Sequence, residues 1–138
     1  MTASNRPIVF AALAGMAAEA PIELAVRGTS MAPHLREGDR VQISRATRYR
    51  AGEILVFRNS VGDLVAHRLL GTRRWEGQLR FVLRGDAAPA ADGLVPPGAI
   101  LGRVVGGDVP RRLVEVPWHD RWRARWRFLA YAFSRLLS

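Results

Sequence analysis

The chain has 138 residues, of which 49% are hydrophobic, so it is long enough for one folded domain and too apolar for a disordered polymer. It contains no cysteine, which excludes disulfides, thiolate catalysis and cysteine-ligated metal sites. All 21 basic residues are arginine, and arginine does not lose its proton at neutral pH, so a lysine-type general base is excluded as well. The formal net charge of +9 favours anionic partners, or reflects solvated arginines on the surface.

Residues 1–20 form an N-terminal segment whose apolar run, Ile8–Ala18, is too short to cross a bilayer as a helix. We expect a short buried or amphipathic helix that is capped near Asn5 and has Pro7 in its first turn. A secretory signal is disfavoured because the positive end is weak and Pro21 would directly follow the cleavage point. The protein is therefore expected in the cytoplasm or at the periphery of the cytoplasmic membrane.

A stiff loop follows the first expected strand, Ile22–Val26, and carries a hydroxyl group. Gly28 allows a turn that a side chain would hinder, and Pro33 restricts the backbone on the other side. Ser30 lies between them, and Met31 can fix the loop to the core. This arrangement suits a nucleophile, although Gly-Thr-Ser alone is also an ordinary polar turn.

Residues 21–116 contain short runs of β-branched and aromatic residues separated by glycine, proline and asparagine turns. This pattern predicts a mainly β fold, namely a coiled antiparallel sheet or partial barrel. Arg111–Val116 is a candidate for a last strand. The other expected strands are Arg40–Ser44, Glu53–Arg58, Leu64–Leu70, Leu79–Arg84 and Ile100–Val105.

His67 lies inside an expected strand, where alternation places it on one face with Val65 and Leu69. A lone histidine in a strand is commonly a satisfied core residue, but in a lysine-free chain the base that activates a serine must be a histidine or a carboxylate. His34 is close enough in sequence to Ser30 to be a minor candidate, and His119 opens the terminal helix. Asp86 and Asp92 are candidates for a carboxylate beside the base, or are turn formers.

The segment Gly28-x-Ser30-Met31-x-Pro33, followed by Leu35 and Gly38-Asp39, resembles the nucleophile segment of signal peptidase I and its self-cleaving repressor relatives. The resemblance continues to about Val105. The strand Val65-x-His67-Arg68 is similar to the base-carrying strand of the endoplasmic-reticulum and archaeal signal peptidases, which use a serine and a histidine.

The resemblance implies a signal-peptidase-like β domain in which Ser30 is the nucleophile and His67 the general base. Asp86 or Asp92 would orient the histidine, with a slight preference for Asp92 because alanines replace the asparagines that often follow Gly-Asp. The Ser30 backbone N–H would stabilise the oxyanion, and Gly28 and Met31 would shape its loop. The substrate would be an extended precursor with small residues before the cleavage point, and no cofactor is required.

Residues 117–138 form a basic amphipathic helix with an apolar stripe at spacings of three and four. The stripe either packs on the β domain or lies in a membrane interface. Phe128 and Tyr131 fall off it, so the helix is apolar on a second side as well. Peripheral membrane contact would involve Trp118, Trp122, Trp126 and Phe133; the rest of the stripe is Leu129 and Leu136.

The sequence is thus best interpreted as a serine endopeptidase that processes a peptide or protein precursor. The alternative is an inactive peptide-binding module that docks on a membrane or partner protein through the basic helix. A nucleic-acid-binding β protein is disfavoured because aromatic stacking platforms are few in the sheet region. A self-cleaving repressor is disfavoured because the chain has neither a lysine nor room for a helix-turn-helix domain. Three scattered histidines make no metal site.

Overall fold

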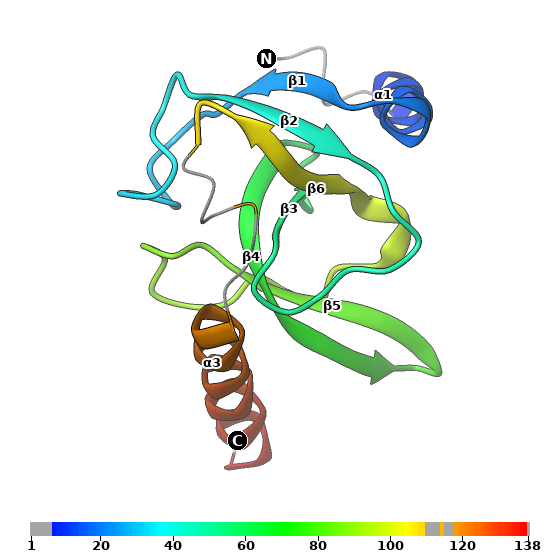
Figure 1. Cartoon of the computed structure of the whole chain (residues 1–138). Helices are drawn as coiled ribbons and strands as arrows, with labels where there is room; N and C mark the ends of the chain where they lie inside the picture. The colour runs from blue at the N-terminus through cyan, green and yellow to red at the C-terminus, as the bar shows by residue number, and fades with distance from the viewer. Residues whose placement is uncertain (1–6, 110–113, 115–117, 138) are drawn as a thin grey trace.

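The computed structural model describes residues 7–109, 114 and 118–137, with residues 7–8, 118–124 and 136–137 described by their backbone alone. One helix lies at each end of a coiled β-sheet (Figure 1). The strand considered at Arg111–Val116 falls outside the described residues except for a single position.

The centre of the molecule is a six-stranded antiparallel sheet with the order β1-β2-β6-β3-β4-β5. β1 and β5 are its two edges, so the sheet is open, and the mainly β prediction is confirmed. The strands are β1 (Ile22–Ala25), β2 (Arg40–Ser44), β3 (Ile54–Arg58), β4 (Leu64–Trp75), β5 (Gln78–Arg84) and β6 (Ile100–Gly107).

β3 is buried on both faces, because each face packs against a different core cluster. Ile54 and Val56 belong to the cluster beneath the N-terminal helix, whereas Leu55 and Phe57 belong to a second cluster with Leu83. The alternation of side chains along a strand produces this division. The sheet therefore forms the rigid centre from which the neighbouring β4 presents its side chains.

β4 is longer than expected, ending at Trp75 instead of Leu70. Its pairing with β5 continues to Trp75 opposite Gln78, beyond a register shift between Leu69 and Gly71. The hairpin then closes through Glu76 and Gly77, both with positive φ, which suits a tight turn between twisted strands. Because this extension is polar and exposed to solvent, it lacks the alternating apolar pattern that predicts a strand.

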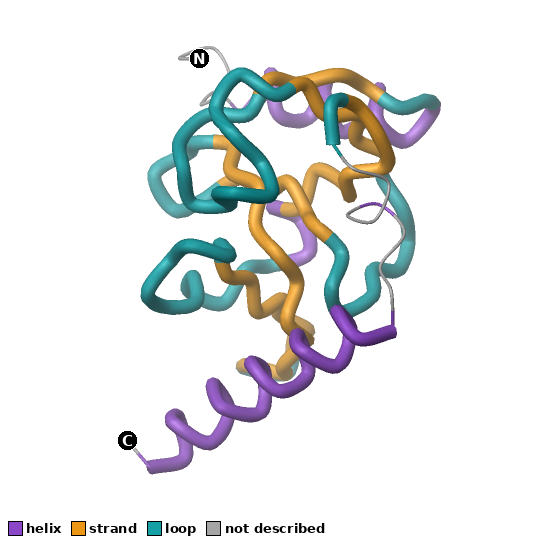
Figure 2. Tube along the Cα trace, turned by 60° about the vertical axis from the view of Figure 1, so that its left-hand side comes forward, coloured by secondary structure: helices purple, strands orange, loops and turns teal. Residues whose placement is uncertain are grey.

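The N-terminal helix α1 (Pro7–Glu19) begins at the proline expected in its first turn and packs on the sheet near β1, β2 and β6. Its buried residues Phe10 and Ala14 share one core cluster with Met31 and Leu35. This contact fixes the loop after β1 to the hydrophobic core. Figure 2 shows α1 and the C-terminal helix at opposite ends of the sheet.

The C-terminal helix α3 (Trp118–Leu137) packs against β4 through the side that lies off the predicted stripe. Phe128 and Tyr131 contact the buried pair Leu70 and Val82. The Phe128 ring lies so close to Gly71 that a Cβ there would be 2.7 Å from it.

The described members of the stripe instead face solvent: Trp126, Leu129 and Phe133 are 65%, 55% and 63% exposed. The side chains of Trp118, His119, Trp122 and Leu136 lie outside the described part. No described helix is both long enough and apolar enough to span a membrane.

Candidate active site

Ser30 lies on a loop that is fixed at both ends. Gly28 has φ +80°, a left-handed conformation that favours glycine, and the loop returns through Gly38 at φ +93°. The Gly38 N–H donates to the Val26 carbonyl at 3.0 Å, which holds the two ends of the loop together. Met31 is only 2% exposed and secures the loop to the core beside the half-buried Ser30.

His67 meets Ser30 from the middle of β4, where it pairs in register with Leu55. Its Nε2 lies 3.0 Å from the Ser30 Oγ, which is hydrogen-bond distance. His67 is 7% exposed, and its ring stands edge-on to Phe57, with 5.7 Å between ring centres. The strand, the aromatic neighbour and the burial together hold the imidazole in one orientation.

Asp92 contacts the other ring nitrogen, with its Oδ2 2.5 Å from His67 Nδ1. Its segment lies along the outer edge of β5: the Asp92 N–H donates to the Leu83 carbonyl, and Val95 pairs with Phe81. A carboxylate at Nδ1 keeps the proton on that nitrogen, so Nε2 is left as an acceptor for the Ser30 hydroxyl. The structure therefore brings together Ser30, His67 and Asp92.

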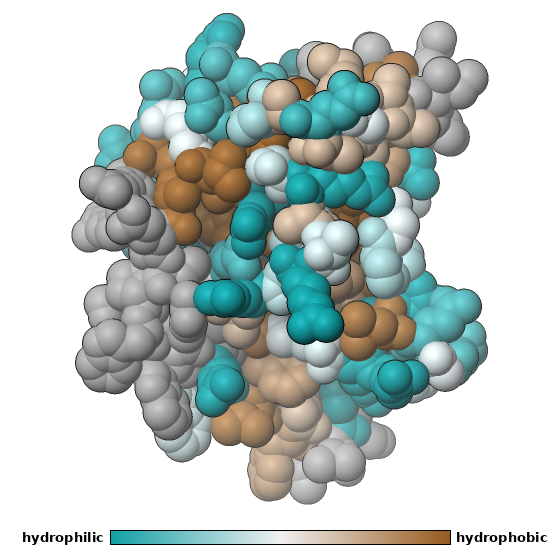
Figure 3. All heavy atoms as spheres, turned by 45° about the vertical axis from the view of Figure 1, so that its right-hand side comes forward, coloured by the Kyte–Doolittle hydropathy of each residue, from teal (hydrophilic) through white to brown (hydrophobic). Residues whose placement is uncertain are grey.

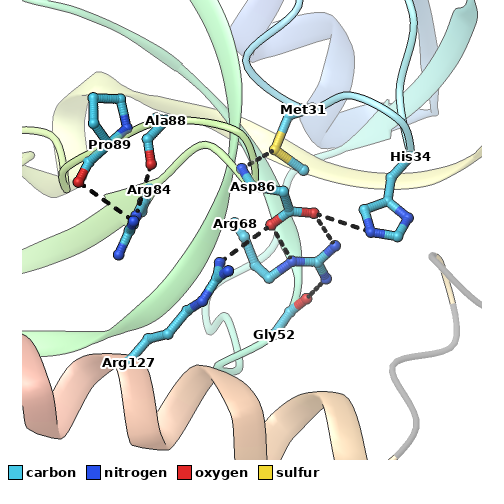
Figure 4. A network of polar contacts seen from close by, with 9 residues as sticks. All are labelled: Met31, His34, Gly52, Arg68, Arg84, Asp86, Ala88, Pro89 and Arg127. Atoms are coloured by element: carbon cyan, nitrogen blue, oxygen red, sulfur yellow. Dashed lines mark hydrogen bonds and ion pairs between the residues drawn. The ribbon is translucent and has the colours of Figure 1, made fainter.

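Asp86 occupies a different place and pairs with Arg68 (Figure 4). Arg68 Nε and Nη2 donate to the two carboxylate oxygens at 2.8 and 2.7 Å, and Nη1 donates to the Gly52 carbonyl. Because consecutive residues of a strand point to opposite faces, the partner of Arg68 is separated from the His67 ring. Of the two candidate acids, only Asp92 contacts the histidine.

Two further basic side chains lie near Asp86. His34 Nε2 is 3.7 Å from its Oδ2, so His34 faces Asp86, and Arg127 of α3 is 3.8 Å from its Oδ1. Burial raises the pKa of Asp86, but the hydrogen bonds and charge of Arg68, with the charges of His34 and Arg127, outweigh burial and leave the pKa lowered. Asp86 is therefore an ionised, cation-bound carboxylate.

The segment Gly85–Ala87 supports the serine loop through its backbone. The Asp86 N–H donates to the Met31 sulfur at 3.3 Å, and the Ala87 N–H donates to the Ser30 carbonyl at 2.8 Å. The ion pair with Arg68 thus fixes a segment that itself contacts the Ser30 loop. Arg68 and Gly85 both lie in motifs of the sequence, but no structural role for either is predicted from the sequence alone.

A groove of about 530 Å³ runs past Ser30 between β1 and the beginning of β4. β1 pairs with β2 on one side only, and Leu64–Ala66 pair with β3 on one side only, so two strand edges border the groove. Its surface is largely aliphatic, with the ion pair between Glu23 and Arg40 along β1 and β2. The aliphatic lining includes Leu24, Val26, Val41, Val56, Leu64 and Ala66.

A protein-family model described as Peptidase S24-like matches residues 6–81, which is more than half of the chain. The chain belongs to the Peptidase S24-like family. The matched region includes Ser30 and His67 and ends before Asp86 and Asp92. The family supports the expected relationship to peptidases, whereas the endoplasmic-reticulum and archaeal subtype stays a prediction. No curated protein matches the chain.

The described residues contain no group of three or more histidine and acidic side chains placed to hold a metal ion. The polar chemistry around Ser30 is supplied by one imidazole and one carboxylate in hydrogen-bond contact. This arrangement can transfer a proton from an alcohol to an imidazole whose charged form is stabilised by a carboxylate.

Proposed function

We propose that the protein is a serine endopeptidase of the serine-histidine type, which cleaves a peptide or protein precursor. The observation that carries the proposal is the continuous contact from Ser30 Oγ to His67 Nε2, at 3.0 Å, and from His67 Nδ1 to Asp92. An inactive binding module needs no such contact between residues 37 positions apart in the chain. Family membership independently supports a peptidase.

In the proposed mechanism, His67 Nε2 accepts the Ser30 hydroxyl proton as Oγ attacks the carbonyl carbon of the scissile peptide bond. Asp92 stabilises the imidazolium that forms, and the Ser30 backbone N–H donates to the developing oxyanion. His67 then gives the proton to the leaving amine. Water, activated by the same imidazole, hydrolyses the acyl-enzyme and restores Ser30.

We propose that the substrate lies extended in the groove between β1 and the beginning of β4. Both borders are strand edges, and an extended peptide can add its backbone hydrogen bonds to such edges. The aliphatic lining would accept apolar side chains before the cleavage point, and the resemblance to signal peptidases implies small residues there. Arg40 and Glu23 would contact the part of the peptide that lies along β1.

The test is cleavage of a synthetic library of internally quenched peptides with small or apolar residues before the bond, with products identified by mass spectrometry. The wild-type chain should cleave a subset, and Ser30→Ala and His67→Ala should abolish that cleavage. His34→Ala is the matched control, because this histidine faces Asp86, and it should retain activity. Unchanged cleavage by folded Ser30→Ala would overturn the proposal.

A further inference from the structure

The outward side of α3 exposes three large apolar side chains in the described residues. Trp126, Leu129 and Phe133 recur at spacings of three and four, so they lie on one side of the helix. More than half of each side chain is exposed. We call these three residues the outer face. Figure 3 shows hydrophobic side chains at the lower end of one face of the molecule.

The outer face is not the surface that attaches α3 to the protein, because a different side of the helix has that role. Phe128 and Tyr131 pack on Leu70 and Val82, and the Phe128 ring is fitted against Gly71. The helix is therefore already docked on the sheet while its most apolar described side remains in contact with solvent. A binding partner would therefore be needed to bury the outer face.

The charges around the outer face identify the chemistry of that partner. α3 contains five arginines and one aspartate, and Arg125 lies next to Trp126 with its side chain exposed. An apolar strip on a helix this rich in arginine, in a chain with a net charge of +9, matches a surface that has acyl chains beneath negatively charged head groups.

We propose that the outer face of α3 docks on the surface of an anionic lipid bilayer, with the helix lying between the bilayer and the sheet. Trp126, Leu129 and Phe133 would enter the head-group and acyl boundary, while Arg125 contacts lipid phosphates. A second copy of the chain fits less well, because a symmetric dimer would bring two arginine-rich surfaces together. The proposal does not depend on the proteolytic activity.

The experiment is co-sedimentation of the full chain with vesicles of phosphatidylcholine alone or mixed equally with phosphatidylglycerol. The wild-type chain should bind the mixed vesicles and lose most of that binding in high salt. The triple variant Trp126→Ser/Leu129→Ser/Phe133→Ser should bind at least about tenfold more weakly. Arg125→Gln should also weaken binding to the mixed vesicles, because it removes an exposed cation next to Trp126.

The matched control is Met16→Ser/Val61→Ser, which removes two exposed apolar side chains away from α3 and should leave vesicle binding unchanged. Circular dichroism and thermal unfolding check that each variant is folded. If the triple variant does not fold, Leu129→Glu replaces it, because one charge in the middle of the outer face should also prevent insertion.

Equal vesicle binding by wild type and a folded outer-face variant would overturn the proposal, as would absence of wild-type binding to anionic vesicles. Analytical ultracentrifugation tests whether a second copy of the chain covers the outer face instead. A wild-type dimer that the triple variant converts to monomer, without vesicle binding, would assign the outer face to a second copy and would also reject the membrane proposal.

Discussion

Gly85 lies against His67 so closely that a Cβ on residue 85 would be 3.1 Å from the imidazole Nε2. The same atom would be 2.7 Å from the Ser30 carbonyl oxygen and 3.1 Å from the Ser30 Cβ. The glycine thus leaves room for the serine and the histidine to meet. The contact involves backbone, which cannot move aside as a flexible side chain can.

Gly85→Ala should therefore separate Ser30 from His67 and lower the rate of acylation by about 100-fold, because small misplacements of reacting groups are costly. The loss in unfolding free energy should be smaller, about 1–3 kcal/mol, as for other overpacked positions. Gly93→Ala is the control, since a Cβ there meets nothing within 4 Å. Equal acylation rates for the two variants, measured with a serine-reactive probe, would refute this role of Gly85.

Asp92→Asn should lower the acylation rate by about 10⁴-fold with little change in stability. The asparagine amide would donate to His67 Nδ1 and favour the tautomer with its proton on Nε2, which cannot accept the Ser30 proton. Stopped-flow or discontinuous labelling with the probe measures the effect. A rate within a few-fold of wild type would show that Asp92 does not orient the histidine.

Asp86→Asn should act mainly on stability. Arg68 and Asp86 are both about nine-tenths buried, and removal of one partner leaves the other charge uncompensated, which costs about 3 kcal/mol of unfolding free energy. Glu23→Gln is the control, because the pair that Glu23 forms with Arg40 is exposed and should contribute less than about 1 kcal/mol. Urea denaturation at neutral pH measures both.

The stability that Asp86 provides should also depend on pH in a defined direction. Its pKa is lower in the folded protein than the ordinary aspartate value of about 3.9, so the stabilisation is fully present above that value. It is lost as the pH falls through the lowered pKa, when the folded protein must take up a proton. The difference between wild type and Asp86→Asn should be constant near neutrality and narrow below about pH 4. A difference that widened in acid would contradict the assignment.

Phe128 and Phe133 form a matched pair on one helix. Phe128→Ala should lower the unfolding free energy by about 2 kcal/mol, because it removes a partly buried ring from Gly71 and the cluster around Leu70. Phe133→Ala should change it by less than about 0.5 kcal/mol, since that ring is 63% exposed. Similar losses for both variants in thermal or urea unfolding would show that the helix packs through a different side.

The sequence was most informative where a short pattern determines local structure. Alternation and turn residues located the strands, and the lysine-free composition directed attention to His67. The sequence pattern ends this strand at Leu70, because the residues that follow, including Thr72 and Arg74, are polar and exposed and lack an alternating apolar pattern. Pairing with β5, which alternation along one segment does not encode, extends the strand to Trp75.

Two other features depend on long-range packing. The spacing of apolar residues described α3 as amphipathic but did not show which side faces the sheet, because the close approach at Gly71 selects Phe128. Asp86 and Asp92 both follow β5 in turn-rich sequence. The bidentate contact with Arg68 makes Asp86 part of a structural ion pair. The alignment of residues 92–95 along β5 brings Asp92, instead, into contact with His67.

The most direct test of the account is labelling of the wild-type chain with a fluorophosphonate probe, followed by mass-spectrometric identification of the modified residue. We predict modification at Ser30, with the rate strongly reduced in His67→Ala and unaffected in His34→Ala. Failure of the folded wild-type chain to react, or modification of Ser30 at the same rate without His67, would contradict the claim that the imidazole activates this serine.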